Sequence, residues 1–444
     1  MRGRQGTARR TTARRRCGAV GRPVLAAALG LGIALMGQPA RAAGQDTVPA
    51  YAFAEDARRI EGAASTADAV ELEPGRTYRS TLPPDAKVLF RLELDDTETA
   101  YASATAVPPP GTGVSVADGV KVTVEDADGR SCDADTATFG APGSPHPVAA
   151  WAMREISPRR SLCAEAGTYY VTVERAAPDA RGASPDPWEL ELSTVSEPGT
   201  RTPDGTAAPG AWDSATSAPV QGTARRRSGG AGFAQAAPLG EGVWRDDIRP
   251  GQTLFYQVPV DWGRQLHATA ELGSSGTDAS RYVASALTLD LYNPVRGQVE
   301  DLSLGYDGGQ KSKALKPLPP VAHENRHASG QQVSAVRFAG AYYLVAHLSP
   351  QVAEHYGDGP VPLTLRVRLG GTARNAPDYA GGTVPEDVFT VDDGGAASTE
   401  GGGAGDETLY RVLAAGGIGT GSALVVGLGI WTVVARRRGA ALPE

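Results

Sequence analysis

Most of the chain between residues 70 and 370 alternates apolar and polar residues with a period of two. This is the spacing of a strand that buries one face, because successive side chains of a β-strand point to opposite sides of the sheet. Turn residues bound each run, and helical periodicity is scarce, so the pattern predicts an all-β fold. The clearest alternating runs are Lys121–Gly129, Thr168–Glu174, Trp188–Ser193, Leu287–Asn293 and Leu363–Leu369.

These runs recur in the same order in two parts of the chain, which indicates an internal repeat. The run "AGTYYVTV" (Ala166–Val173), for example, is matched by "AGAYYLVA" (Ala339–Ala346), and the spacing between matched runs is nearly equal in the two parts. We therefore predict two homologous, tandem β-sandwich domains of jelly-roll-like type, at residues 46–198 and 236–371. The other matched runs are Leu72–Tyr78 with Ile248–Leu254, Val120–Asp133 with Ala286–Asp301, and Asp186–Ser193 with Val361–Leu369.

Residues 1–42 have the features of a secretory signal peptide. Arginines without any acidic residue are frequent in residues 2–22, and an apolar run of signal-peptide length follows at Val24–Gly37. The sequence Ala40-Arg41-Ala42 fits a cleavage site, so we expect this segment, with Cys17, to be removed.

A second apolar run, Val412–Ala435, contains no charged residue and is long enough to cross a bilayer as a helix. Three arginines, Arg436–Arg438, follow it directly. Since basic residues flank membrane spans on the cytoplasmic side, we expect a cytoplasmic tail at residues 436–444 and an extracellular N-terminal ectodomain. The chain is thus predicted to be a single-pass cell-membrane protein, held there by its C-terminal helix.

Two stretches of the ectodomain hold little that could be buried. Residues 199–235 are rich in Pro, Gly, Ser, Thr and Ala, which predicts a flexible linker that proteases cut most readily at Arg225–Arg227. Residues 372–410 are glycine-rich, and no basic residue lies among the acidic ones from residue 376 onward, which predicts a flexible acidic stalk. The net charge of −7 becomes more negative without the nine arginines of residues 1–42, so nucleic acid is excluded as a partner.

The segment "HENRH" (His323–His327) matches the zinc-protease signature H-E-x-x-H. That signature needs a helix of several turns to point both imidazoles at one metal. Three prolines lie in residues 317–320 and a glycine follows three residues after the motif, so little room is left for such a helix. The motif is therefore interpreted as a polar loop without a catalytic zinc. The alternative is a structural or adventitious metal site with His347 or His355.

Five carboxylates lie close together in the sequence, and calcium favours several carboxylate oxygens. Asp128-Gly129 is also a favoured hairpin turn, which makes the other acids solvated neighbours of a turn. We predict the hairpin and no metal site, with calcium as the alternative. No nucleophile elbow and no phosphate-binding loop occur in the sequence. The five acids are Glu125, Asp126, Asp128, Asp133 and Asp135.

Cys132 and Cys163 are the only cysteines left after signal-peptide removal. Because the predicted compartment is oxidising, we expect them to form a disulfide. The bridge would hold both ends of a proline-rich loop that has no cysteine counterpart in the second repeat.

The order of strand, turn, variable loop, "AG-x-YY" strand and final alternating strand resembles the bacterial pre-peptidase C-terminal (PPC-like) domain. It is carried by "EDADGRSC", "AGTYYVTV" and "WELELS" in the first repeat and by "DLYNPVRG", "AGAYYLVA" and "LTLRVRL" in the second. The resemblance implies small β-sandwiches with accessory roles in binding, localisation or secretion, as in actinobacterial membrane-anchored secreted proteins. Of each tyrosine pair, Tyr169/Tyr170 and Tyr342/Tyr343, we expect one ring in the core and one at its rim.

These observations lead to one functional hypothesis and one alternative. The hypothesis is a non-enzymatic, membrane-anchored extracellular binding or scaffold protein of the cell envelope, without catalytic residues or a cofactor. Its partner would be an envelope protein or polysaccharide, bound by loops at the sandwich ends. The alternative is a secreted hydrolase, metal-dependent or not, with an unrecognised site around "HENRH" or the five carboxylates.

Overall fold

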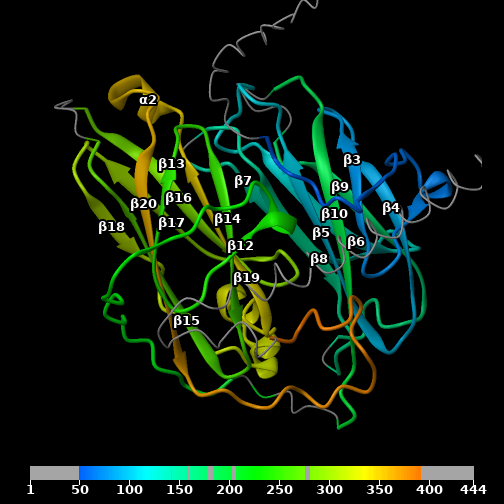
Figure 1. The fold of residues 1–444 in the computed structure, drawn as a ribbon. Coiled ribbons are helices and arrows are strands. Elements are labelled where there is room, and N and C mark those ends of the chain that lie inside the picture. Colours follow the sequence, from blue (N-terminus) through cyan, green and yellow to red (C-terminus); the bar gives the residue numbers. More distant parts are fainter. Residues whose placement is uncertain are drawn as a thin grey trace, which may run out of the picture. The chain divides into compact units, whose positions relative to one another are not determined.

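The computed structural model describes most of residues 50–391, and the chain there forms four five-stranded sheets that pair into two β-sandwiches (Figure 1). The predicted signal peptide, membrane span and cytoplasmic tail lie outside the described residues. No helix within the described part is both long and apolar enough to span a bilayer. The residues not described inside this range are Pro142, Arg159, 178–183, 203–206, 208 and 276–280.

The first sandwich packs a sheet of order β1-β3-β10-β5-β8 against one of order β2-β4-β9-β6-β7. Its core follows the alternation in the sequence, since Val120, Val122 and Val124 of β6 and Leu190 and Leu192 of β10 are buried together. The elements are β1 (Arg58–Arg59), η1 (Thr66–Asp68), β2 (Val70–Glu71), β3 (Thr77–Leu82), β4 (Val88–Leu94), β5 (Glu98–Val107), β6 (Gly119–Asp126), β7 (Ser131–Thr138), β8 (Val148–Arg154), β9 (Gly167–Arg175) and β10 (Trp188–Pro198).

The second sandwich repeats this arrangement strand for strand, with sheets β11-β13-β20-β15-β18 and β12-β14-β19-β16-β17. The prediction of tandem all-β sandwiches is therefore confirmed. The elements are β11 (Arg225–Arg226), η2 (Phe233–Gln235), β12 (Ala237–Pro238), β13 (Gly242–Ile248), β14 (Thr253–Val260), β15 (Arg264–Leu272), β16 (Val283–Tyr292), β17 (Gln298–Tyr306), β18 (Lys311–Ala314), η3 (His323–His327), α1 (Gln331–Ser334), β19 (Gly340–Leu348), α2 (Gln351–Tyr356) and β20 (Val361–Gly371).

One of the four matched sequence runs was paired wrongly. Leu72–Tyr78 leads into β3, whereas Ile248–Leu254 leads into β14, which is the counterpart of β4. Both runs make a tight turn with a glycine at positive φ, Gly75 at +73° and Gly251 at +81°. Such turns select the same residues wherever they occur, so their similarity does not identify the strand that follows.

The two "AG-x-YY" strands, β9 and β19, behave as predicted. The rings of Tyr169 and Tyr342 are buried in the two cores, and Tyr170 and Tyr343 are only partly buried. Each buried hydroxyl donates to a carbonyl four residues upstream: Tyr169 to Glu165 at 2.6 Å and Tyr342 to Phe338 at 2.8 Å. The tyrosines thereby tie the loop before each strand to its own sandwich.

The linker and stalk predictions differ from the structure. The short strand β11, inside the predicted linker, pairs with β13, and Gln265 donates to the carbonyl of Asp213, so the second sandwich holds part of that linker. Two-residue strands are too short to show an alternation, which is why the sequence pattern missed them.

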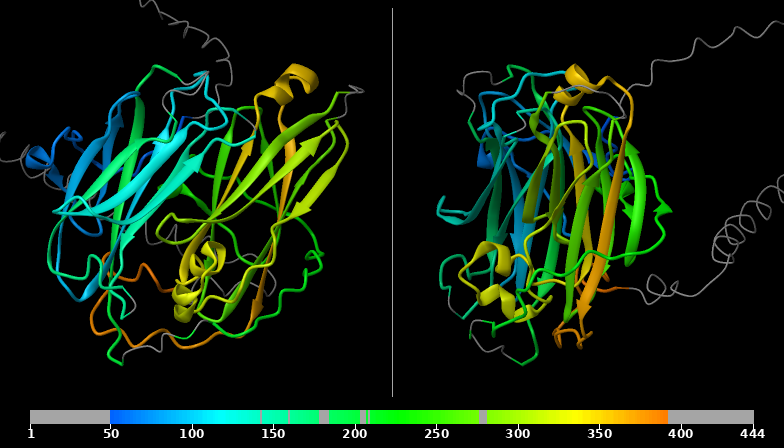
Figure 2. Two further views of the ribbon diagram at one scale, coloured as in Figure 1. Left: turned by 180° about the vertical axis from the view of Figure 1, so that it is seen from behind. Right: turned by 90° about the vertical axis from the view of Figure 1, so that its left-hand side faces the viewer.

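Residues 372–391, here called the return segment, are not a free stalk. They run back from the second sandwich to the first (Figure 2), where Ser196 exchanges two backbone hydrogen bonds with Val384. Phe389 is 2% exposed and stacks on Phe338. The composition of this segment is typical of a flexible chain, but the contacts of a few residues such as Val384 and Phe389 hold it against the sandwiches.

Candidate functional site

The two sandwiches share a continuous junction. The apolar core of the second sandwich extends into Tyr101, Trp151 and Met153 of the first. At Gly297 an added Cβ would lie 2.5 Å from the Trp151 ring, so only glycine lets this turn approach β8 so closely. The junction is therefore packed like a domain interior rather than joined by a loose linker.

Glu197, at the end of β10, is the centre of a buried polar network at this junction. Its carboxylate accepts hydrogen bonds from Arg326 of η3 at 2.7 Å, Tyr101 of β5 at 2.6 Å and Tyr379 of the return segment at 2.8 Å. His323 lies 3.5 Å from the same carboxylate. Burial acts to raise the pKa of Glu197, but Arg326 and the hydrogen bonds outweigh it and hold the pKa well below its usual range.

The "HENRH" segment therefore has a role that the sequence did not indicate. It forms the 3-10 helix η3, which has three residues per turn and does not align residues i and i+4 on one face. His323 faces Glu197, while His327 lines a cleft. Arg326 of the same segment is the ion-pair partner of Glu197.

The other histidines named as metal ligands lie elsewhere. His347 stacks on His146 at 4.4 Å and bonds to Ser144, and His355 is on α2. Among the described residues, no group of three or more His, Cys, Asp or Glu side chains could hold a metal ion.

A second buried carboxylate, Glu191 of β10, closes the junction at another point. It accepts bonds from Arg296 at 2.6 Å, from the hydroxyl of Tyr51 at 3.0 Å and from the backbone N–H of Ala54 at 2.9 Å. Arg296 has a positive φ of 63° in the turn that follows β16. The side chain of Asn293 holds that turn by accepting two backbone N–H bonds.

Between the sandwiches lies a cleft of about 550 Å³, here called the junction cleft. One wall comes from β7, β8 and the loop after β8, and the other comes from η3, α1 and the residues that follow. Strand edges thus line the candidate site, not only the loops at the sandwich ends that the sequence analysis expected. The lining side chains are Asp133, Asp135, Trp151, Met153, Glu155, Ser157, Arg160, Arg326, His327, Ser329, Gln331, Ser334 and Arg337, with Ala134 and Ala328.

The five carboxylates of the first repeat divide between two places. Asp126 accepts bonds from the backbone and side chain of Arg130 and so closes the predicted hairpin turn at Asp128-Gly129. Asp133 and Asp135 instead point at β8 and accept the N–H groups of Met153 and Trp151.

Burial raises the pKa of both Asp133 and Asp135. These two side chains cover the free edge of β8, where unpaired N–H groups would otherwise face the cleft. The calcium alternative for the five acids has no geometric support among the described residues.

The polar groups of the cleft are held in place by their neighbours. Arg337 donates to the carbonyl of Ser334 at 2.6 Å and lies 3.4 Å from Glu155, which also pairs with Arg160 at 3.7 Å. An acidic wall thus faces a basic wall, with amide and hydroxyl groups between them. Such fixed donors and acceptors suit a polar ligand rich in hydroxyl groups. Gln331, Ser334 and Arg337 belong to no sequence motif, so sequence reasoning missed them.

The predicted disulfide between Cys132 and Cys163 is present. It joins the start of β7 to the loop before β9 and so encloses the chain that carries β8. The bond therefore supports one wall of the junction cleft as well as the core of the first sandwich.

Comparisons with known proteins found only solved structures of low similarity to this chain. No family model matches the chain, and no curated protein matches it. Solved structures with similar parts include the g-type lysozyme inhibitor PliG of Aeromonas hydrophila, 11% identical with a TM-score of 0.17, covering 33% of this chain and all of that one.

Two tandem-module structures were also found. The CBM22-1-CBM22-2 tandem of Paenibacillus barcinonensis Xyn10C is 11% identical, with a TM-score of 0.17, and covers 65% of this chain and 84% of that one. The CUB1-EGF-CUB2 part of human MASP-1/3 is 10% identical, with a TM-score of 0.16, and covers 66% and 99%. At these values we draw no functional conclusion from them.

Proposed function

We propose that this chain is a membrane-anchored extracellular binding protein of the cell envelope, and that its junction cleft binds an envelope polysaccharide. The single observation that carries the proposal is the cleft itself. It is of ligand size, it is lined by carboxylate, guanidinium, amide and hydroxyl groups, and the charged ones are fixed by bonds to their neighbours.

The packed junction also supports a binding role, because the two sandwiches do not move as independent modules. Because Glu191 and Glu197 are buried against the second sandwich, the two cleft walls are held at a fixed spacing. A preformed site loses less conformational entropy on binding than one assembled from mobile domains. The signal peptide and the C-terminal span expected from the sequence, together with the PPC-like resemblance, support placement of this site outside the membrane.

A variant whose junction cleft is filled by a large side chain tests the proposal. Ser329→Trp places a large side chain at an exposed cleft position, and Ser65→Trp makes the same change at an exposed position before η1 of the first sandwich, outside the cleft. We expect the full-length protein in detergent to bind the polysaccharide fraction of the producing cell's envelope, and Ser329→Trp to weaken binding about tenfold or more by filling the site. Ser65→Trp should bind like the unmodified protein. Biolayer interferometry measures all three.

Two results would count against this proposal. Equal affinity in all three proteins would mean that the polysaccharide binds elsewhere or that the cleft is not the site. Shortening of the polysaccharide during incubation, seen by size-exclusion chromatography, would favour the hydrolase alternative. That alternative has one supporting observation, since the cleft brings His327 together with Asp133 and Asp135.

A further inference from the structure

The outer face of the sheet β11-β13-β20-β15-β18 carries a row of arginines. Arg226 of β11 pairs in register with Arg245 of β13, and Arg366 and Arg368 lie two residues apart on β20. Arg366 of β20 lies in register with Val243 of β13. Val243 is two residues from Arg245 on the same strand, so both point to the same face of the sheet. Arg366 therefore shares the face of Arg245. These four residues are here called the arginine face.

The matching face of the first sandwich is built differently. Arg59 pairs in register with Arg79, as Arg226 does with Arg245, so the two registers correspond. Arg79 lies opposite Glu191 on β10 and forms its ion pair with Glu189. In the second sandwich the residue opposite Arg245 is Thr364, and arginines follow it on β20. On the strand next to the arginine, the first sandwich thus carries carboxylates, whereas the second carries a threonine and two further arginines.

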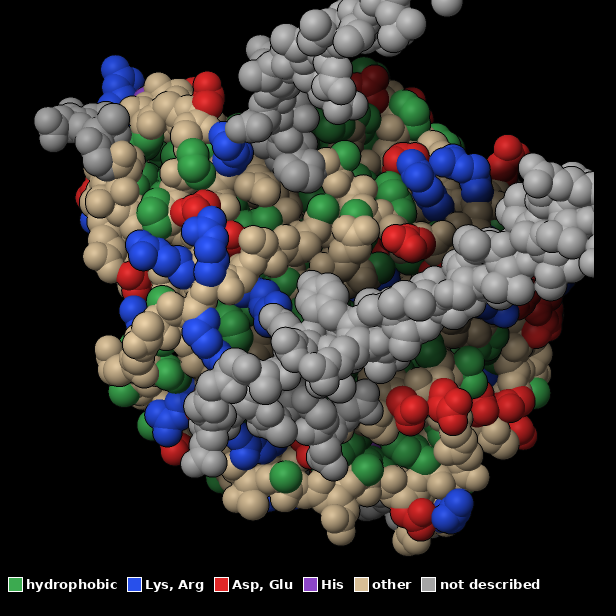
Figure 3. Space-filling view, in the orientation of Figure 1, with side chains coloured by type: hydrophobic (Ala, Val, Ile, Leu, Met, Phe, Trp, Pro, Cys, Tyr) green, Lys and Arg blue, Asp and Glu red, His purple; other side chains and the backbone are tan. Residues whose placement is uncertain are grey.

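The remaining charge on the arginine face is positive. Arg226 pairs with Asp247 at 2.7 Å and Arg366 with Glu271 at 3.2 Å. Arg245 and Arg368 are exposed and form no ion pair with any residue that the structure describes. Residues 46–198 hold twice as many acidic as basic residues, whereas the two kinds nearly balance in residues 209–371. Figure 3 shows lysines and arginines gathered over the second sandwich on one side of the molecule.

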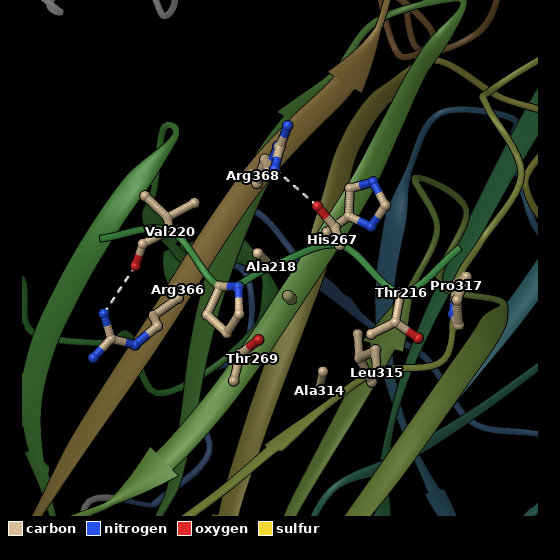
Figure 4. Close-up of a pocket in the computed structure, with 13 residues that line it drawn as sticks. Thr216, Ala218, Val220, His267, Thr269, Ala314, Leu315, Pro317, Arg366 and Arg368 are labelled. Atoms are coloured by element: carbon tan, nitrogen blue, oxygen red, sulfur yellow. Dashed lines mark hydrogen bonds between the residues drawn. The ribbon is translucent and has the colours of Figure 1, made fainter. Parts of the chain in front are cut away.

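Part of the predicted linker fixes the two arginine side chains of β20. Arg366 donates to the carbonyl of Val220 and Arg368 to the hydroxyl of Ser217, each at 2.9 Å (Figure 4). The linker crosses the sheet over a small pocket of about 20 Å³. The guanidinium groups are therefore partly ordered before any ligand binds, which lowers the entropy cost of an ionic contact.

We propose that the arginine face binds an anionic polysaccharide of the cell envelope through its phosphate or carboxylate groups. The proposal rests on the extracellular location proposed above and adds a second site of different chemistry. Adjacent strands are about 4.8 Å apart and successive strand residues about 3.3 Å apart. The four arginines cover three strands and four residue steps, so they present cations over roughly 15 Å. A polymer with repeated charges can use this spacing and a single small anion cannot.

A membrane surface fits this face less well. Peripheral binding to lipid combines basic residues with exposed apolar side chains that enter the bilayer. The large exposed apolar residues of the described part all lie off this sheet face. They are Val70, Val116, Leu162, Tyr282 and Val384.

The test uses charge-matched variants of the full-length protein. Arg245→Ser with Arg368→Ser removes two unpaired cations from the arginine face, and Arg58→Ser with Arg59→Ser removes two exposed cations from the matching edge of the first sandwich. The probes are poly(glycerol phosphate), polygalacturonate, neutral dextran and vesicles of phosphatidylglycerol with phosphatidylcholine.

We expect at least one of the two anionic polymers to bind and dextran not to bind. Affinity should fall about tenfold in the Arg245/Arg368 variant at low salt, and the difference should shrink as salt is raised, because exposed charges are screened. The Arg58/Arg59 variant should be unaffected. Arg245→Lys with Arg368→Lys should keep most of the affinity, which separates lost charge from lost folding.

Absence of binding to both polymers would overturn the proposal, as would an equal loss in the two serine variants. Binding to the vesicles alone would assign the face to lipid instead. The Ser329→Trp variant separates this proposal from the function proposed for the cleft. It should bind the anionic polymers with unchanged affinity even if the cleft ligand is wrongly identified.

Discussion

Replacing Glu197 with glutamine is expected to destabilise the protein by about 3–5 kcal/mol, the usual cost of removing one partner of a buried ion pair. The change keeps the side-chain shape, so it leaves no cavity. It leaves the guanidinium of Arg326, only 11% exposed, without its counter-charge. Urea unfolding of the full-length protein at pH 7 measures the effect.

Glu189→Gln is the matched control on the same strand. Glu189 also pairs with an arginine, but its side chain is 41% exposed. Exposed pairs contribute about 0–1 kcal/mol, so this variant should unfold nearly like the parent. Equal and small effects of the two substitutions would show that Glu197 is not buried against the second sandwich in solution.

The stability lost in the Glu197→Gln variant should also depend on pH, and it should become smaller in acid. Because the folded state lowers the pKa of this carboxyl, its contribution is fully present above the pKa of the unfolded chain, about 4.3. It is lost as the pH falls through the unfolded pKa toward the lower folded pKa. The difference in stability between parent and Glu197→Gln should therefore shrink from pH 6 to pH 2. A difference that grows in acid would contradict the assigned network.

Removing the disulfide is the other change with a large expected effect. Cys132→Ser with Cys163→Ser opens a link between residues 31 apart, which on the chain-entropy model costs about 3–4 kcal/mol. The loss falls on the loop that holds β8, so the cleft wall should loosen as well. Thermal unfolding of the double variant, compared with the parent under non-reducing conditions, measures the change.

Mass spectrometry of a non-reduced digest is the control for this experiment. It should find the Cys132 and Cys163 peptides joined within one chain. Free thiols on both peptides, or an unchanged melting temperature in the double variant, would contradict the role assigned to the bond.

The features that local pattern determines could be predicted from the sequence. Alternation located the long strands, and the repeat gave two sandwiches of the same strand order. The prediction that each "AG-x-YY" pair has one tyrosine in the core and one at its rim was correct, because successive side chains of a strand point to opposite faces. The cysteine pair followed from their number and the expected compartment.

The junction could not be predicted in this way. Glu191 and Glu197 belong to a strand whose polar positions face away from its own core, so alternation predicts them to be solvent-exposed. They become buried because the second sandwich, the return segment and the residues before β1 pack on that face. Their arginine partners, Arg296 and Arg326, are 105 and 129 residues away, and single arginines give no periodic signal.

Amide hydrogen–deuterium exchange on the full-length protein, with and without the envelope polysaccharide, tests whether the ligand binds in the junction cleft. We expect the ligand to slow exchange in residues 131–138 and 148–154 of the first sandwich together with residues 327–337 of the second, since these segments line one cleft. Protection confined to one sandwich, or to loops remote from these segments, would contradict the cleft as the binding site.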